Sequence, residues 1–63
     1  MPKYEVHTNG GNVFPETDDR EAVELASDIN MGIVMAQGTP VFLNIGAGVY
    51  RLTAIAWIRA IEE

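Results

Sequence analysis

The sequence predicts a small α+β domain in which one helix packs on an antiparallel sheet, with the elements in the order β-β-α-β-β. Three observations predict it. Polar and apolar residues alternate near the N-terminus, apolar residues then recur at helical spacing, and two β-rich runs separated by a glycine-rich turn follow Pro40. We expect a single domain over residues 1–63, with a hairpin at 3–15, a helix at 18–36 and C-terminal strands at 41–61.

The first predicted element is the hairpin. Residues 3–8 read KYEVHT, and their apolar and polar side chains fall on opposite faces of a strand. Asn and Gly tolerate positive φ, so the sequence NGGN at 9–12 predicts a turn. Val13 and Phe14 begin the return strand. Pro15 has no N–H to donate to a ladder, so this strand should lie at a sheet edge or end there.

The predicted helix covers residues 18–36. Asp18, followed three residues later by Glu21, resembles a capping box at the helix N-terminus. Acidic residues in the first turn are also favoured by the helix dipole. Gly38, two residues before Pro40, is a stop signal for the C-terminus.

The helix has one apolar stripe and one acidic face. We expect Leu25 and Ile29 to be buried against the sheet, while Glu24 and Asp28 stay exposed. The alternative ends the helix at Gly32 and makes the next four residues a strand. The members of the predicted stripe are Ala22, Leu25, Ala26, Ile29 and Ile33.

The C-terminal part of the chain is rich in β-branched and aromatic residues. Residues 41–45 should form a strand, 46–48 a hairpin loop and 49–53 the return strand. The residues that follow, up to 61, predict a fifth strand. The alternative is a helix over 49–62, because this segment contains Ala54, Ala56 and Ala60 and no turn residue follows Gly48.

The size of the chain predicts self-association. A chain of 63 residues buries only about 60% of its unfolded surface, so it needs a stabiliser. It has no cysteine and one histidine, which excludes disulfides and multi-histidine metal sites. The strand near residues 55–61 lacks the proline that protects the other edge, so we expect pairing with a second copy through Trp57 or Ile58. Trp57 is otherwise expected in the core.

The net charge of −5 comes from one acidic segment, residues 16–28. Direct binding of nucleic acid is not expected, since no basic patch is present to neutralise phosphates. A membrane span is not expected either, because polar residues and glycines interrupt the uncharged run from 29 to 50. The N-terminus lacks the apolar stretch of a signal peptide, so we expect a cytoplasmic protein.

No set of residues predicts catalysis, a cofactor or a metal. His7 has no evident catalytic partner and should be a solvated surface residue. The sequence GAG at 46–48 lacks the third glycine of a dinucleotide fingerprint, since Arg51 stands there. Asp18 and Asp19 do not have the ligand spacing of an EF-hand, and helix capping explains them.

Two functions are therefore expected. The first is a non-enzymatic binding or interaction protein that acts as a homo-oligomer, a homodimer or larger, with another protein as a further partner. The alternative is an inhibitor of the kind encoded by phages or mobile elements, whose acidic helix face mimics nucleic acid. Glu21, Glu24 and Asp28 would form that face.

Overall fold

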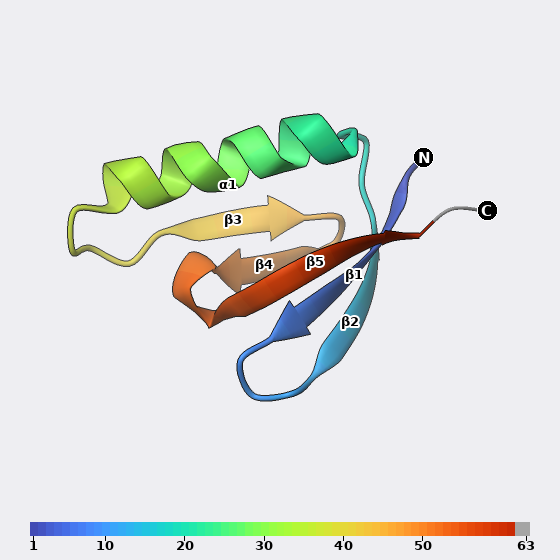
Figure 1. The fold of residues 1–63 in the computed structure, drawn as a ribbon, viewed down its shortest axis with the longest axis horizontal. Coiled ribbons are helices and arrows are strands. Elements are labelled where there is room, and N and C mark those ends of the chain that lie inside the picture. The colour runs from blue at the N-terminus through green and yellow to red at the C-terminus, as the bar shows by residue number, and fades with distance from the viewer. Residues whose placement is uncertain (62–63) are drawn as a thin grey trace.

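A computed structural model describes residues 1–61 and shows an antiparallel α+β fold (Figure 1). Strands β2, β1 and β5 form a three-stranded sheet in that order, and β3 and β4 form a two-stranded sheet. In both ribbon views the β3–β4 hairpin lies between the helix and the three-stranded sheet. The elements are β1 (Lys3–Thr8), β2 (Val13–Thr17), α1 (Ala22–Ala36), β3 (Phe42–Ile45), β4 (Gly48–Arg51), a 3-10 turn (Leu52–Ala54) and β5 (Ile55–Ile61).

This structure confirms the predicted fold class and element order, including the fifth strand. The alternative of a helix over 49–62 is wrong, because the segment forms β4, the short 3-10 turn and β5; residue 62 lies outside the described range. The alternative that ended the helix at Gly32 is also wrong, since α1 continues to Ala36. Gln37 and Gly38 then adopt positive φ, of 42° and 85°, which ends the helix.

Helix α1 begins at Ala22, four residues after the predicted start at residue 18. Glu21 is the residue before the first turn, with extended backbone angles and no capping hydrogen bond from its side chain. The predicted capping box is therefore wrong. Asp18 does not cap the helix because its carboxylate binds Arg20 and the backbone of Gly46 instead.

The buried face of α1 differs in part from the predicted stripe. Leu25 is buried, as predicted, and Ile29 is half-buried. Ala22, Ala26 and Ile33 are exposed, Ile33 to 59%, so their place in the buried stripe was wrong. The helix approaches its neighbour at Gly32, where an added Cβ would lie 2.5 Å from Cδ1 of Leu52. Because Gly32 faces inward there, Ile33 is turned toward solvent. A pattern of large apolar residues does not reveal a contact made by a glycine.

The first hairpin forms as predicted and continues two residues beyond Pro15. The N–H of Thr8 donates to the carbonyl of Asn12 at 2.9 Å, and Gly11 has a φ of 85° in the turn. Strand β2 is an edge strand, which explains how it accommodates Pro15. Pro15 lies opposite Glu5 on β1.

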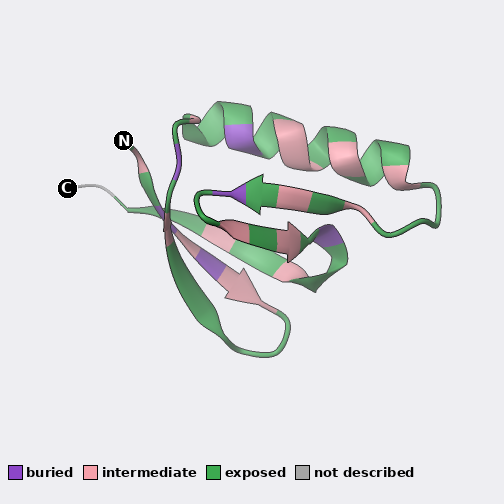
Figure 2. Ribbon diagram, turned by 180° about the vertical axis from the view of Figure 1, so that it is seen from behind, coloured by how far each residue is buried: buried purple, intermediate pink, exposed green. Residues whose placement is uncertain are grey.

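The core is small for the number of apolar residues in the chain (Figure 2). Trp57 is 53% exposed, so its predicted place in the core is wrong. The buried apolar side chains are Tyr4, Val6, Leu25, Ile45 and Leu52. The large apolar side chains left exposed are Met1, Val13, Phe14, Val23, Met31, Ile33, Val34, Met35, Phe42, Val49, Trp57 and Ile61.

Candidate functional site

Strand β5 carries the predicted contact residues at an edge of the three-stranded sheet. Antiparallel pairing with β1 sets Trp57 opposite His7 and Ile58 opposite Val6. The two residues therefore point to opposite faces of the sheet. Ile58 is half-buried and packs against the core, whereas Trp57 lies on the outer face.

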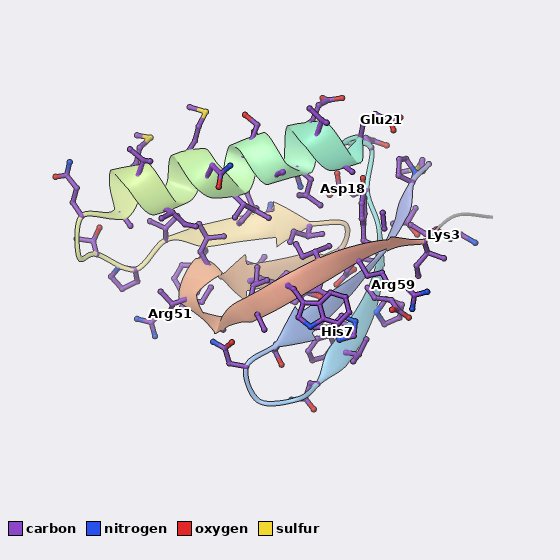
Figure 3. All side chains as sticks on the ribbon, in the orientation of Figure 1. Lys3, His7, Asp18, Glu21, Arg51 and Arg59 are labelled. Atoms are coloured by element: carbon purple, nitrogen blue, oxygen red, sulfur yellow. The ribbon has the colours of Figure 1, made fainter. Side chains whose placement is uncertain are left out.

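The outer face of the sheet brings together aromatic and charged side chains from β1 and β5. The rings of His7 and Trp57 stack, with centroids 3.7 Å apart and planes inclined by 12°. Glu5 Oε1 lies 3.5 Å from His7 Nε2 and 3.7 Å from Arg59 Nη1. Figure 3 shows His7 and Arg59 on adjacent strands. The prediction of a solvated His7 is wrong, because its side chain is only 21% exposed beneath Trp57.

The ring of His7 is held by stacking and not by hydrogen bonds from Nε2. His7 Nε2 forms no hydrogen bond with any residue in the described range, and Glu5 Oε1, at 3.5 Å, lies beyond good hydrogen-bonding distance. The stack holds the indole of Trp57 against the sheet, with about half of its surface open.

The inner face of β5 borders an open apolar groove of about 360 Å³ that runs between the strand and α1. Small side chains form much of its wall, including Ala26 on the helix and both Ala56 and Ala60 on β5. Ile29 and Ile58 add larger apolar surfaces. The groove therefore joins an unpaired strand edge to an apolar surface.

The acidic segment, residues 16–28, contains an ion pair between Asp18 and Arg20 in which the carboxylate is buried. Asp18 is 6% exposed and receives hydrogen bonds from Arg20 Nη2 and from the N–H of Gly46, both at 2.7 Å. Arg20 also binds Asp28, with Nη1 3.0 Å from Oδ2, and donates to the carbonyl of Asn44. Through these contacts, residues 18–20 before α1 bind both the helix and the β3–β4 hairpin.

The same contacts shift the pKa values of both partners. The hydrogen bonds from Arg20 hold the pKa of Asp18 well below its usual range, against the opposing effect of burial. The pKa of Arg20 is raised, chiefly by its hydrogen bonds to Asp18 and then to Asp28. Near this cluster, burial and a hydrogen bond to Glu16 raise the pKa of Tyr50 to about 12.

The structure places the predicted acidic face at the start of α1. Glu21 and Glu24 are exposed, and no ion pair involves either one within residues 1–61. Asp28 is half-buried and paired with Arg20, so it does not stay fully exposed as predicted. Of the three predicted residues, only Glu21 and Glu24 therefore carry exposed carboxylates without an ion pair in the described range (Figure 3 labels Glu21).

Comparisons with protein-family models, with curated proteins and with solved structures gave no match. Within residues 1–61, no three His, Cys, Asp or Glu side chains are grouped as a metal site would require. No helix in the described part of the chain is long and apolar enough to cross a membrane.

The sequence did not predict two of these contacts, the His7–Trp57 stack and the ion pair of Arg20 with Asp18. The His7–Trp57 stack joins residues at opposite ends of the chain, and only the register of β1 with β5 brings them together. The ion pair of Arg20 with Asp18 had a local signal, since an acid and a base two residues apart can meet in a turn. A capping role explained Asp18 equally well from the sequence alone.

Proposed function

We propose that this chain is a non-enzymatic interaction protein that acts as a homo-oligomer, with a second copy of itself as its first partner. The observation that carries the proposal is the excess of exposed large apolar side chains over the buried ones. A contiguous apolar surface on a small monomer marks an interaction site. The groove between α1 and β5, with Trp57 beside it, is one such surface. A second lies along the outer side of α1, over Val23, Met31, Val34 and Met35.

The unpaired edge of β5 supports the same proposal. Edge strands in stable proteins are usually covered, charged or interrupted by proline. Strand β2 contains Pro15, but β5 has seven residues with no proline and a single charge, on Arg59. A partner that covers β5 would satisfy its backbone groups and shield the adjoining groove.

We expect the protein to sediment as a dimer or larger species at micromolar concentration. Trp57→Lys should shift it toward monomer, because a charge would enter the apolar contact and the exposed indole would be lost. The matched control is Val49→Lys, a similar change at a residue that is 65% exposed on β4. Sedimentation equilibrium measures the mass, and circular dichroism checks that both variants fold.

A folded wild-type monomer at about 100 μM would contradict the proposal, since a complex with a micromolar Kd is largely assembled there. Equal dissociation of the Trp57→Lys and Val49→Lys variants would place the contact elsewhere. Dissociation of the first variant alone supports the surface around β5.

The exposed carboxylates of Glu21 and Glu24 support a second candidate, an inhibitor that mimics nucleic acid. It has less support than self-association because Asp18 is buried and Asp28 is paired with Arg20. A partner protein with a basic groove would then be recovered in an affinity pull-down, and its recovery should fall as salt increases.

The variant Glu21→Gln/Glu24→Gln should abolish such recovery while leaving the fold intact, because both side chains are exposed. Asp28 is left unchanged in this test, since its replacement would also break the pair with Arg20. Equal recovery of a basic partner by the wild type and the double variant at low salt would contradict the mimic.

A further inference from the structure

The backbone of β5 has a definite set of outward-pointing groups. The N–H of Thr8 donates to Asn12 and the N–H of Asp18 donates to the carbonyl of Pro2, so even-numbered residues of β1 direct their backbone groups toward β2. Hydrogen-bonded pairs alternate along antiparallel strands, and the odd-numbered residues of β1 therefore bond to β5. Their partners are Trp57, Arg59 and Ile61.

It follows that Ile58 and Ala60 direct their N–H and C=O groups away from β1, toward the unpaired edge of β5. Ile58 is also the midpoint of the seven-residue strand Ile55–Ile61. A two-fold axis beside Ile58 pairs the whole strand with its copy, and Ile58 then forms a hydrogen-bonded pair with the partner's Ile58. The backbone N–H and C=O groups of Ile58 and Ala60 are therefore already oriented for this pairing.

Neighbouring registers fit less well. An axis beside Arg59 would set two guanidinium groups directly opposite each other, which is unfavourable. An axis beside Trp57 would pair only residues 55–59 and leave the end of β5 uncovered. The register centred on Ile58 instead places Trp57 opposite the partner's Arg59, so that each copy supplies one cation and one indole.

The outer face favours this contact. His7 covers one face of the Trp57 ring from the β1 side, and the indole remains 53% exposed. The side away from β1 is where a paired strand would lie, so the partner's Arg59 would approach the open part of the indole as a cation–π contact. On the outer face, the side chains that lie in one row across the four strands β1, β5, the partner's β5 and the partner's β1 would then be His7, Trp57, the partner's Arg59 and the partner's Glu5.

The inner face permits the same pairing. Across the axis, Ala60 lies opposite the partner's Ala56, and both positions line the apolar groove. Small side chains there leave room for the partner's α1 to approach, and its exposed Ile33 supplies apolar surface to cover the groove. The contact is self-complementary, as a two-fold interface requires.

We propose that two copies join through antiparallel pairing of β5 with β5 about an axis at Ile58, which forms one six-stranded sheet whose outer face carries two Trp57–Arg59 contacts. This inference rests on the proposed homo-oligomer and specifies its partner surface and register. It also assigns the α1–β5 groove to the partner's helix.

Disulfide trapping tests the register. The chain has no native cysteine, so only the introduced cysteines can form a disulfide. Chains carrying Ala56→Cys are mixed in equal amounts with chains carrying Ala60→Cys and oxidised mildly, which leaves Trp57 and Arg59 in place. These positions would face each other as a hydrogen-bonded pair about 5.5 Å apart between Cα atoms, within the range for a disulfide. The same residue on two chains would be at least about 13 Å away, because four residues of strand separate positions 56 and 60, and this distance prevents a bridge.

The mixed disulfide, which joins position 56 of one chain to position 60 of the other, should therefore clearly exceed the half expected of random pairing, as mass spectrometry would show. A majority of either homodisulfide would overturn the register, and random proportions would do the same. Val49→Cys on β4 is the control and should remain mostly unbridged.

A second measurement uses the wild-type chain. Backbone hydrogen exchange at Ile58 and Ala60 should slow at least about tenfold between a dilute monomeric sample and a concentrated one, because pairing would protect these amides. Unchanged exchange in a sample that sediments as a dimer would overturn the β5 pairing while leaving the homo-oligomer standing. A monomer at every concentration would overturn both.

Discussion

Replacing Asp18 with asparagine should lower the free energy of unfolding by about 3 kcal/mol, the largest effect we expect from a single polar substitution. Asp18 is buried and binds Arg20 through both carboxylate oxygens, as well as the N–H of Gly46. An amide of the same shape would remove the buried charge that compensates Arg20 and leave only the more exposed Asp28 as its ionic partner. The total free energy of unfolding of a native protein is about 5–15 kcal/mol, so a loss of this size is a large fraction of it.

Asp19→Asn is the matched control for this prediction. Asp19 is the neighbouring acid and is exposed, so its replacement should change stability by no more than about 0.5 kcal/mol. Urea denaturation of the two variants and the wild type gives the comparison. Similar midpoints for all three proteins would show that the buried ion pair contributes little to stability.

The pH dependence follows from the lowered pKa of Asp18. A lowered pKa in the folded state gives stability that is fully present above the unfolded value, about 3.9, and is lost as pH falls toward the folded value. The stability difference between wild type and Asp18→Asn should therefore narrow by about 1 kcal/mol from about pH 6 to about pH 3. A difference that stays constant over this range would contradict the assignment.

Leu25→Ala should destabilise the fold by about 2–5 kcal/mol, because Leu25 is the buried residue of α1 and packs with Tyr4, Val6 and Ile45. Glu24→Ala, one position earlier on the exposed side of the helix, should cost within about 0.5 kcal/mol. Thermal unfolding followed by circular dichroism compares the two. Equal melting temperatures would mean that the wrong face of α1 has been assigned to the core.

The sequence predicted the elements because each has a strong local signal. The alternation around Tyr4 and Val6 indicated β1, and the helical spacing of Leu25 and Ile29 indicated α1. The predicted start of the helix was wrong because the local sequence fits two roles of Asp18 equally well, a helix cap and an ion pair with Arg20.

The surface was harder to predict because it depends on contacts between distant residues. Trp57 was expected in the core since large aromatic residues are usually well buried. The register of β5 on β1 places it on the outer face against His7, and no local pattern encodes that register. The same limit applies to Gly32, which meets Leu52 only because the chain folds back on itself.

The pairing of β1 with β5 also sets the order in which the chain can fold. Lys3 lies opposite Ile61, so this ladder closes a loop that contains both hairpins and the helix. Closing so long a loop costs more conformational entropy than closing either hairpin, and contacts of this kind slow folding. The hairpins and α1 should therefore form first, and β5 should dock last.

Until β5 docks, β1 presents an open edge to any strand that reaches it. In a concentrated solution that strand can be β5 of a neighbouring chain, and the result is a domain-swapped pair. Rapid dilution during refolding should favour the chain's own β5.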